Sequence, residues 1–70
     1  MTYKEAQVIL LLLGWKHDTS IHWVHPDKGW LTIYSKSMNY SYIFNYYPER
    51  INNINGKHFK TYEEGIDYIK

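Results

Sequence analysis

Aromatic side chains occupy every second position from Tyr40 to Tyr46, and this alternation is the clearest pattern in the chain. Successive side chains of a β-strand point to opposite faces of the sheet. We therefore predict a strand over residues 40–47 with one aromatic face. A small domain has difficulty covering both faces of a sheet, so the surplus of rings indicates a surface that contacts another molecule.

The same two-residue period predicts two strands upstream, over residues 21–25 and 30–36. The Pro26-Asp27-Lys28-Gly29 sequence is typical of a turn between them, and residues 37–39 provide the next turn. Short turns between consecutive strands favour an antiparallel meander.

Two parts of the chain carry weaker patterns. Residues 15–20 fit either a loop or an extension of the first strand. Residues 50–57 contain three asparagines and the Asn55-Gly56 dipeptide, which predicts a loop or a short hairpin. Residues 58–60 then add at most a brief strand.

Helices are expected at both ends of the chain. Thr2 and Glu5 have the spacing of a capping box, and Gly14 provides a left-handed stop for the helix that follows. Thr61 and Glu64 repeat the capping-box spacing at the start of a second helix, which continues to the C-terminus. The predicted order of elements is α-β-β-β-α.

We predict one α+β domain over residues 1–70, a three-stranded antiparallel meander with the N- and C-terminal helices packed on one face. Aliphatic side chains suit the covered face better than tyrosines, whose hydroxyls need partners when buried. The helices would then cover Val24, Leu31, Ile33 and Ile43. The face away from the helices would carry Trp23, Trp30, Thr32, Tyr34, Tyr40, Tyr42, Phe44 and Tyr46. The reverse assignment and a mixed one remain alternatives.

The first helix has apolar residues on two sides. At 100° per residue, one side gathers Tyr3, Ala6, Ile9, Leu10 and Leu13. The opposite side carries Val8, Leu11 and Leu12. Either the second helix and the loop over residues 50–57 cover this second side, or it contacts a partner or a second copy of the chain.

Composition narrows the functional classes. The chain has 70 residues, a net charge of +1, 19% aromatic residues and no cysteine, so disulfides are excluded. Its basic residues are scattered, whereas nucleic-acid-binding proteins usually carry a basic stripe. The apolar run from Val8 to Leu13 is far shorter than a membrane span. Frequent Ile, Lys, Asn and Tyr are typical of AT-rich genomes, such as those of low-GC bacteria and their phages.

The sequence offers little for catalysis or metal binding. His22 and His25 are three residues apart, and in a strand such positions face opposite ways. With no cysteine and no adjacent carboxylate pair, we expect no metal site and no cofactor. Glu63, Glu64 and Asp67 fit a solvated helix face, or alternatively a mimic of a phosphate backbone.

Gly14-Trp15 followed by His25-Pro26-Asp27 resembles the HicA-type mRNA interferase toxins over about the first third of the chain. In that family a helix ends in a Gly-aromatic step and a strand reaches a His-Pro-Asp-Gly turn, on a double-stranded-RNA-binding-like fold. The resemblance implies an RNase whose catalytic histidine lies in a Gly-Ser-His motif, five residues before the turn histidine. That position is Ser20 here, so the motif is absent, and only His17 or His22 in a shifted register could replace it.

These observations predict a non-catalytic, cytoplasmic protein-binding module, and we expect it to be a phage or mobile-element inhibitor of a host protein or defence enzyme. The expected partner-binding residues are Trp23, Trp30, Tyr34, Tyr40, Tyr42 and Tyr46. The expected oligomer or partner face is Val8, Leu11 and Leu12. A nucleic-acid-binding domain that stacks bases on the aromatic face is the alternative, and a degenerate interferase is the third.

Overall fold

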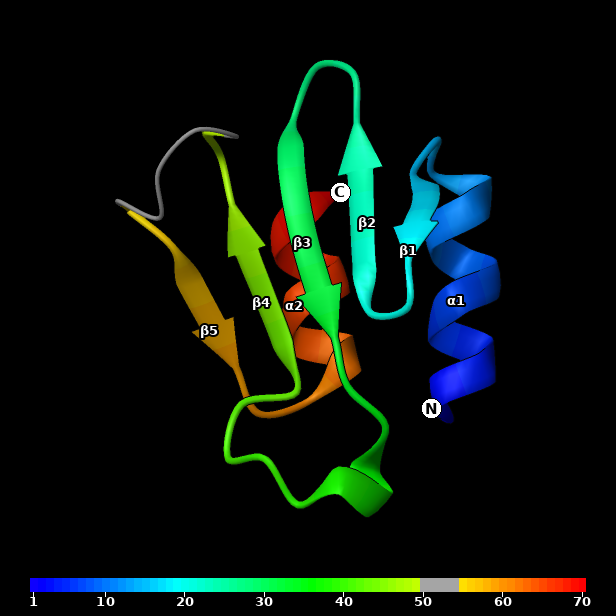
Figure 1. Cartoon of the computed structure of the whole chain (residues 1–70), viewed down its shortest axis with the longest axis vertical. Helices are drawn as coiled ribbons and strands as arrows, with labels where there is room; N and C mark the ends of the chain where they lie inside the picture. Colours follow the sequence, from blue (N-terminus) through cyan, green and yellow to red (C-terminus); the bar gives the residue numbers. More distant parts are fainter. Residues whose placement is uncertain (50–54) are drawn as a thin grey trace.

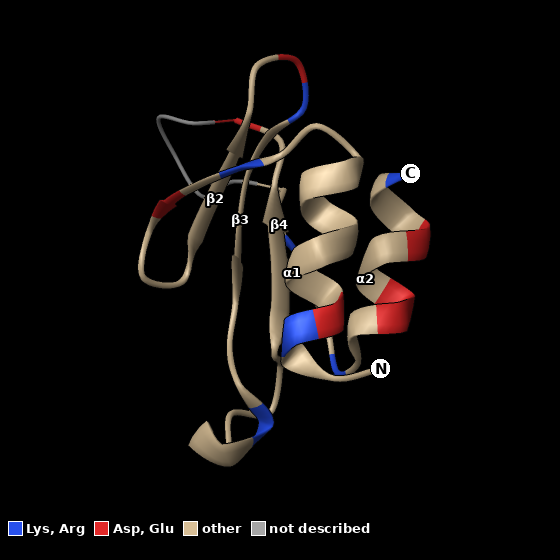
Figure 2. Ribbon diagram, turned by 90° about the vertical axis from the view of Figure 1, so that its right-hand side faces the viewer, with Lys and Arg blue, Asp and Glu red and all other residues tan. Residues whose placement is uncertain are grey.

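Figure 1 shows the computed structural model of the chain, which describes residues 1–49 and 55–70. Its elements are α1 (Tyr3–Leu12), β1 (Lys16–Thr19), β2 (His22–His25), β3 (Gly29–Ile33), the 3₁₀ helix η1 (Lys36–Met38), β4 (Phe44–Tyr47), β5 (Lys57–Phe59) and α2 (Tyr62–Ile69). The strands form one antiparallel sheet in the order β1-β2-β3-β4-β5. Both helices lie on the same side of this sheet (Figure 2). The protein is therefore of mixed α+β class.

The sheet has five strands rather than the three that the periodicity predicts. The uncertain segment after the first helix forms β1, which pairs with β2, and the brief strand expected near the second helix is β5. The strand expected over residues 40–47 begins only at Phe44. Asn39 adopts a left-handed conformation with φ of 58° at the end of η1, and the chain continues as a loop to residue 43.

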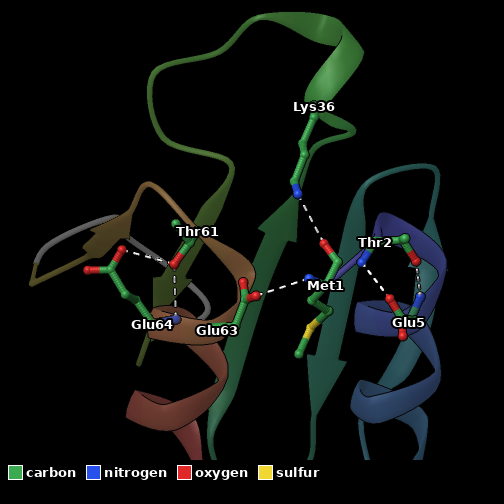
Figure 3. A network of polar contacts seen from close by, with 7 residues as sticks. All are labelled: Met1, Thr2, Glu5, Lys36, Thr61, Glu63 and Glu64. Atoms are coloured by element: carbon green, nitrogen blue, oxygen red, sulfur yellow. Dashed lines mark hydrogen bonds and ion pairs between the residues drawn. The ribbon is translucent and has the colours of Figure 1, made fainter.

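Both helices begin at the predicted N-caps. The Thr2 hydroxyl accepts the Glu5 N–H at 3.1 Å, and the Glu5 carboxylate accepts the Thr2 N–H at 2.8 Å, which completes the capping box. The Thr61 hydroxyl accepts the Glu64 N–H at 3.2 Å and donates to the Glu64 carboxylate at 2.9 Å (Figure 3). Gly14 follows α1 with φ of +91°, the left-handed stop that the sequence predicts.

The start of the chain connects both helices and the η1 loop (Figure 3). The Met1 ammonium lies 3.0 Å from the Glu63 carboxylate at the start of α2. The Lys36 ammonium donates to the Met1 carbonyl at 3.0 Å and lies 5.6 Å from the centre of the Tyr62 ring. The bond from the Met1 ammonium is the main cause that lowers the pKa of Glu63 below its ordinary value. The backbone N–H of Thr2 is the main cause that lowers the pKa of Glu5.

The helix-facing side of the sheet mixes aliphatic and aromatic side chains. Leu31 and Ile33 are buried there as predicted, but Trp23 and Phe44 are buried beside them. Strand register explains the mixture, because cross-strand partners share a face: Trp23 pairs with Leu31, and Phe44 pairs with Ile33. The full core consists of Ala6, Leu10, Trp15, Trp23, Leu31, Ile33, Ile43, Phe44, Tyr62, Ile66 and Ile69.

Two tyrosine rings also lie on the helix-facing side of the sheet, because their hydroxyls find hydrogen-bond acceptors there. The Tyr46 hydroxyl donates to the Lys28 carbonyl, and the Tyr62 hydroxyl donates to the Tyr34 carbonyl at 2.6 Å. Each of these hydroxyls therefore has an acceptor. This removes the free-energy cost of burying an unpaired hydroxyl, on which the prediction of exposed tyrosines rested. Burial also raises the pKa of Tyr46 and of Tyr62, so both remain protonated donors at neutral pH.

Gly65 is the position where α2 approaches the sheet most closely. A Cβ atom on Gly65 would overlap the ring of Phe44, which is fully buried. We expect Gly65→Ala to lower the free energy of unfolding by about 1–3 kcal/mol, although alanine favours helices over glycine. Urea unfolding measures the change, with Asp67→Ala on the exposed side of α2 as control. A stabilised Gly65→Ala variant would show that α2 lies farther from β4.

The lowered pKa values of Glu5 and Glu63 make stability depend on pH. A carboxyl whose pKa is lower in the folded state stabilises the fold above its ordinary pKa of 4.5, and this contribution disappears as the pH falls through the folded pKa. We therefore expect the urea midpoint to fall between about pH 5 and pH 3. The fall should be smaller in Glu63→Gln and Glu5→Gln. Asp67→Asn controls for the general change in charge, and equal pH profiles for all variants would contradict the assignment.

Candidate functional site

The face of the sheet opposite the helices carries two rows of side chains that cross the strands. The first row consists of Lys16, Val24, Trp30 and Tyr47, and the second of His22, Thr32, Asn45 and His58. Neither α1 nor α2 lies on this side (Figure 2). We call these two rows, with the rings of Tyr34, Tyr40 and Tyr42 at their end, the open face.

Aromatic rings pack against one another along the open face. Trp30 and Tyr47 are stacked, with ring centres 4.3 Å apart and planes at 22°. His22 lies 5.7 Å from Trp30 on one side, and His58 lies 5.9 Å from Tyr47 on the other. The Trp30 indole N–H donates to the Glu49 carbonyl at 3.0 Å, which fixes the ring. One face of the Trp30 ring therefore lies against one face of the Tyr47 ring.

Asn45 organises the polar part of the open face from a buried position. Its side-chain amide donates to the Thr32 hydroxyl at 3.3 Å and to the Tyr42 carbonyl at 3.2 Å. Its amide oxygen is 2.7 Å from His58 Nδ1. Because that oxygen can only accept, His58 Nδ1 must carry the proton, which in the neutral ring leaves Nε2 as an acceptor. Asn45 thereby connects β3, β5 and the loop before β4.

The loop between β3 and β4 supplies the most exposed rings of the open face. Tyr40 lies against Tyr34, with ring centres 4.3 Å apart, and the Lys60 ammonium lies 6.0 Å from the centre of the Tyr42 ring. Partial burial, assisted by the nearby Tyr34 hydroxyl, raises the pKa of Tyr47, so this hydroxyl stays a hydrogen-bond donor at neutral pH. The loop and the rows together offer hydroxyls and ring edges to a partner.

The structure separates the six residues expected to bind a partner. Trp30 and Tyr34 lie on the open face, and Tyr40 and Tyr42 lie in the adjoining loop. The expectation for Trp23 is wrong, because this ring is buried on the helix side and stacked on His17 at 4.6 Å. Tyr46 is also on the helix side, where it packs near Trp15 and Tyr68.

Val24 shows the opposite error. It was expected under the helices, yet it pairs with Trp30 and lies on the open face.

Sequence reasoning also missed Tyr47 and Asn45. The alternation that begins at Tyr40 gave both to the face opposite the aromatic one. That face is in fact the open face, because Phe44 pairs with Ile33 on the helix side and Tyr47 pairs with Trp30.

The rows of the open face carry no carboxylate, but they do carry Lys16, His22 and His58. The acidic residues of α2 lie in the helix layer on the other side of the sheet (Figure 2). His22 and His58 are on strands separated by β3 and β4, so about 14 Å lies between their positions. This separation is too great for the two rings to act on one proton-transfer step.

The residues that carry the interferase resemblance have structural contacts. Trp15 is buried and lies 5.3 Å from the ring of His25. The His25 Nδ1 accepts the Asp27 N–H at 3.1 Å, which stabilises the turn. Within residues 1–49 and 55–70, no group of three His, Cys, Asp or Glu side chains is placed to hold a metal ion. None of the described helices is long and apolar enough to cross a membrane.

Comparisons of the chain with protein-family models, with curated proteins and with solved structures give no significant match.

A second candidate surface lies on α1. Val8, Leu11 and Leu12 are 49%, 57% and 81% exposed, respectively, so the described part of α2 does not cover them. The loop over residues 50–57 was the other expected cover, but residues 50–54 lie outside the described residues. We call these three residues the α1 stripe.

Asn45 provides a test of the open face as an ordered unit. Asn45→Ala removes bonds to Thr32, Tyr42 and His58 from a buried position, so we expect a loss of about 1–3 kcal/mol in the free energy of unfolding. Urea unfolding measures it, with the exposed Ser41→Ala as control. Equal stabilities would show that the network does not hold the face together.

Proposed function

We propose that this protein is a non-catalytic protein-binding module that uses the open face as its contact surface. The observation that carries the proposal is the row of packed rings around Trp30 and Tyr47 on the side of the sheet away from α1 and α2, with the exposed Tyr40 and Tyr42 beside it. Tryptophan and tyrosine dominate binding hot spots, because they bury large areas at low entropic cost. Rings already held by stacking and by the Trp30–Glu49 bond lose little further freedom on binding.

The size of the open face suits one protein partner. The Cα trace extends 28 Å by 24 Å along its two longest axes, close to the plane in which Figure 1 shows the sheet. A standard interface buries about 800 Å² on each partner, so a contact of that size would use most of this side of the molecule. A net charge of +1 also suits a neutral protein surface better than a nucleic acid.

We further propose that the module blocks a host protein or defence enzyme as a phage or mobile-element inhibitor in the host cytoplasm. The support is the small size of the chain and a composition typical of AT-rich genomes. A rigid surface that occupies one partner face is sufficient for stoichiometric inhibition and requires no catalytic group.

Nucleic-acid binding is the second candidate. It is favoured by the lack of carboxylates in the two rows and by Lys16, His22, His58 and Lys60 on or near the open face. Against it, bases stack on free ring surfaces, and the mutual stack of Trp30 and Tyr47 already occupies one face of each ring. For this reason we place it behind protein binding.

The experiment first identifies the partner and then measures the site. A photo-crosslinking amino acid at Ser41, which is exposed beside Tyr42, captures the partner in native host cells. Calorimetry with the purified partner then compares variants. We expect Trp30→Ala and Tyr42→Ala to weaken binding by tenfold or more, as hot-spot residues do. Tyr68→Ala is the matched control, because Tyr68 is 51% exposed on α2 and Tyr42 is 47% exposed.

Two outcomes would overturn the proposal. One is that Tyr42→Ala and Trp30→Ala bind the partner as tightly as Tyr68→Ala. The other is that single- or double-stranded oligonucleotides quench tryptophan fluorescence with an affinity that falls steeply with salt, which supports the second candidate instead.

A further inference from the structure

The α1 stripe ends beside a shallow depression on the same helix. This depression has a volume of about 390 Å³ and is lined by Lys4, Glu5, Val8 and Ile9. Leu12, the most exposed apolar side chain of the stripe, projects one turn beyond Val8. One helix surface therefore presents both an apolar projection and an apolar hollow.

We propose that a second copy of this chain docks on the α1 stripe, with the two α1 helices antiparallel about a two-fold axis at Val8. Positions 4 and 12 are equally far from Val8 along the helix. The two-fold axis therefore places Leu12 of each copy over the depression of the other. Such a contact is isologous and closes after two subunits.

Charge favours the antiparallel arrangement. The last turn of α1 has no basic residue, so the negative end of its dipole is uncompensated within the helix. The two-fold axis brings Lys4 of each copy beside this end of the other helix. A parallel pair would instead place Lys4 against Lys4 and Glu5 against Glu5.

The proposed contact between the two copies is small, so their affinity for each other should be low. Three apolar side chains and the depression cover much less than the roughly 800 Å² per partner of a standard interface, so we expect a dissociation constant on the order of 100 µM. The contact uses the helix layer, which leaves both open faces free (Figure 2). The dimer would thus present two copies of the proposed binding surface. This inference does not depend on the proposed function.

Analytical ultracentrifugation of the purified chain from 10 µM to 1 mM tests the proposal. We expect a reversible monomer–dimer equilibrium for the wild type and a monomer throughout for Leu12→Glu. Met38→Glu is the control, because Met38 is also an exposed apolar side chain, at 50% against 81% for Leu12, but lies on η1. This variant should dimerise like the wild type. Circular dichroism and urea unfolding verify that each variant keeps the fold.

Lys4→Glu separates dimerisation from helix stability. A carboxylate in the first turn stabilises α1 through its dipole, yet it would repel the C-terminal end of the second copy. We expect an unchanged or higher urea midpoint together with dimerisation weakened at least threefold.

A wild type that remains monomeric at 1 mM, or a Leu12→Glu variant that dimerises as well as the wild type, would overturn the proposal. If the wild type is monomeric and Leu12→Glu abolishes binding of the partner captured through Ser41, the α1 stripe belongs to that partner rather than to a second copy.

Discussion

Strands β3 and β4 pair so that Ile33 lies opposite Phe44 and Trp30 lies opposite Tyr47. Cross-strand partners share a face, so this one register sends Phe44 toward the helices and brings Tyr47 against Trp30. A slip by one residue would exchange the two faces of β4, exposing Phe44 and burying Asn45 under α2. The core and the open face therefore depend on the same pairing. Close packing of Phe44 against Gly65 and the bonds of Asn45 both hold β4 in this register.

Much of the fold could be predicted from local signals. Side-chain chemistry within a few residues predicts the two N-caps, the left-handed Gly14, the turn after β2 and the helix layer on one face. The number of strands could not be predicted from the sequence, because all four residues of β1 are exposed and show no apolar alternation. The start of β4 could not be predicted either. Tyr40 and Tyr42 keep the two-residue period of a strand, but the backbone around them is a loop after the left-handed Asn39.

The candidate site was predictable only in part for the same reason. Trp30 lies on the face predicted for it, because its neighbours Leu31 and Ile33 are the aliphatic residues of β3 and are buried on the helix side. Trp23 and Tyr46 were misplaced, because rings suit either face of a sheet. Trp23 follows the register that pairs it with Leu31. For Tyr46 the deciding group is the Lys28 carbonyl, which comes from a distant turn and accepts the Tyr46 hydroxyl. Such tertiary acceptors leave no trace in the local sequence.

The Trp30–Tyr47 stack is the centre of the binding surface that we propose. Nuclear Overhauser effects between side-chain protons in solution test this most directly. The account predicts strong contacts between the Trp30 indole and the Tyr47 ring, together with contacts between the Phe44 ring and the Gly65 Hα protons. Contacts of Trp30 with Tyr46 instead of Tyr47, or a Phe44 ring without any contact to α2, would contradict it.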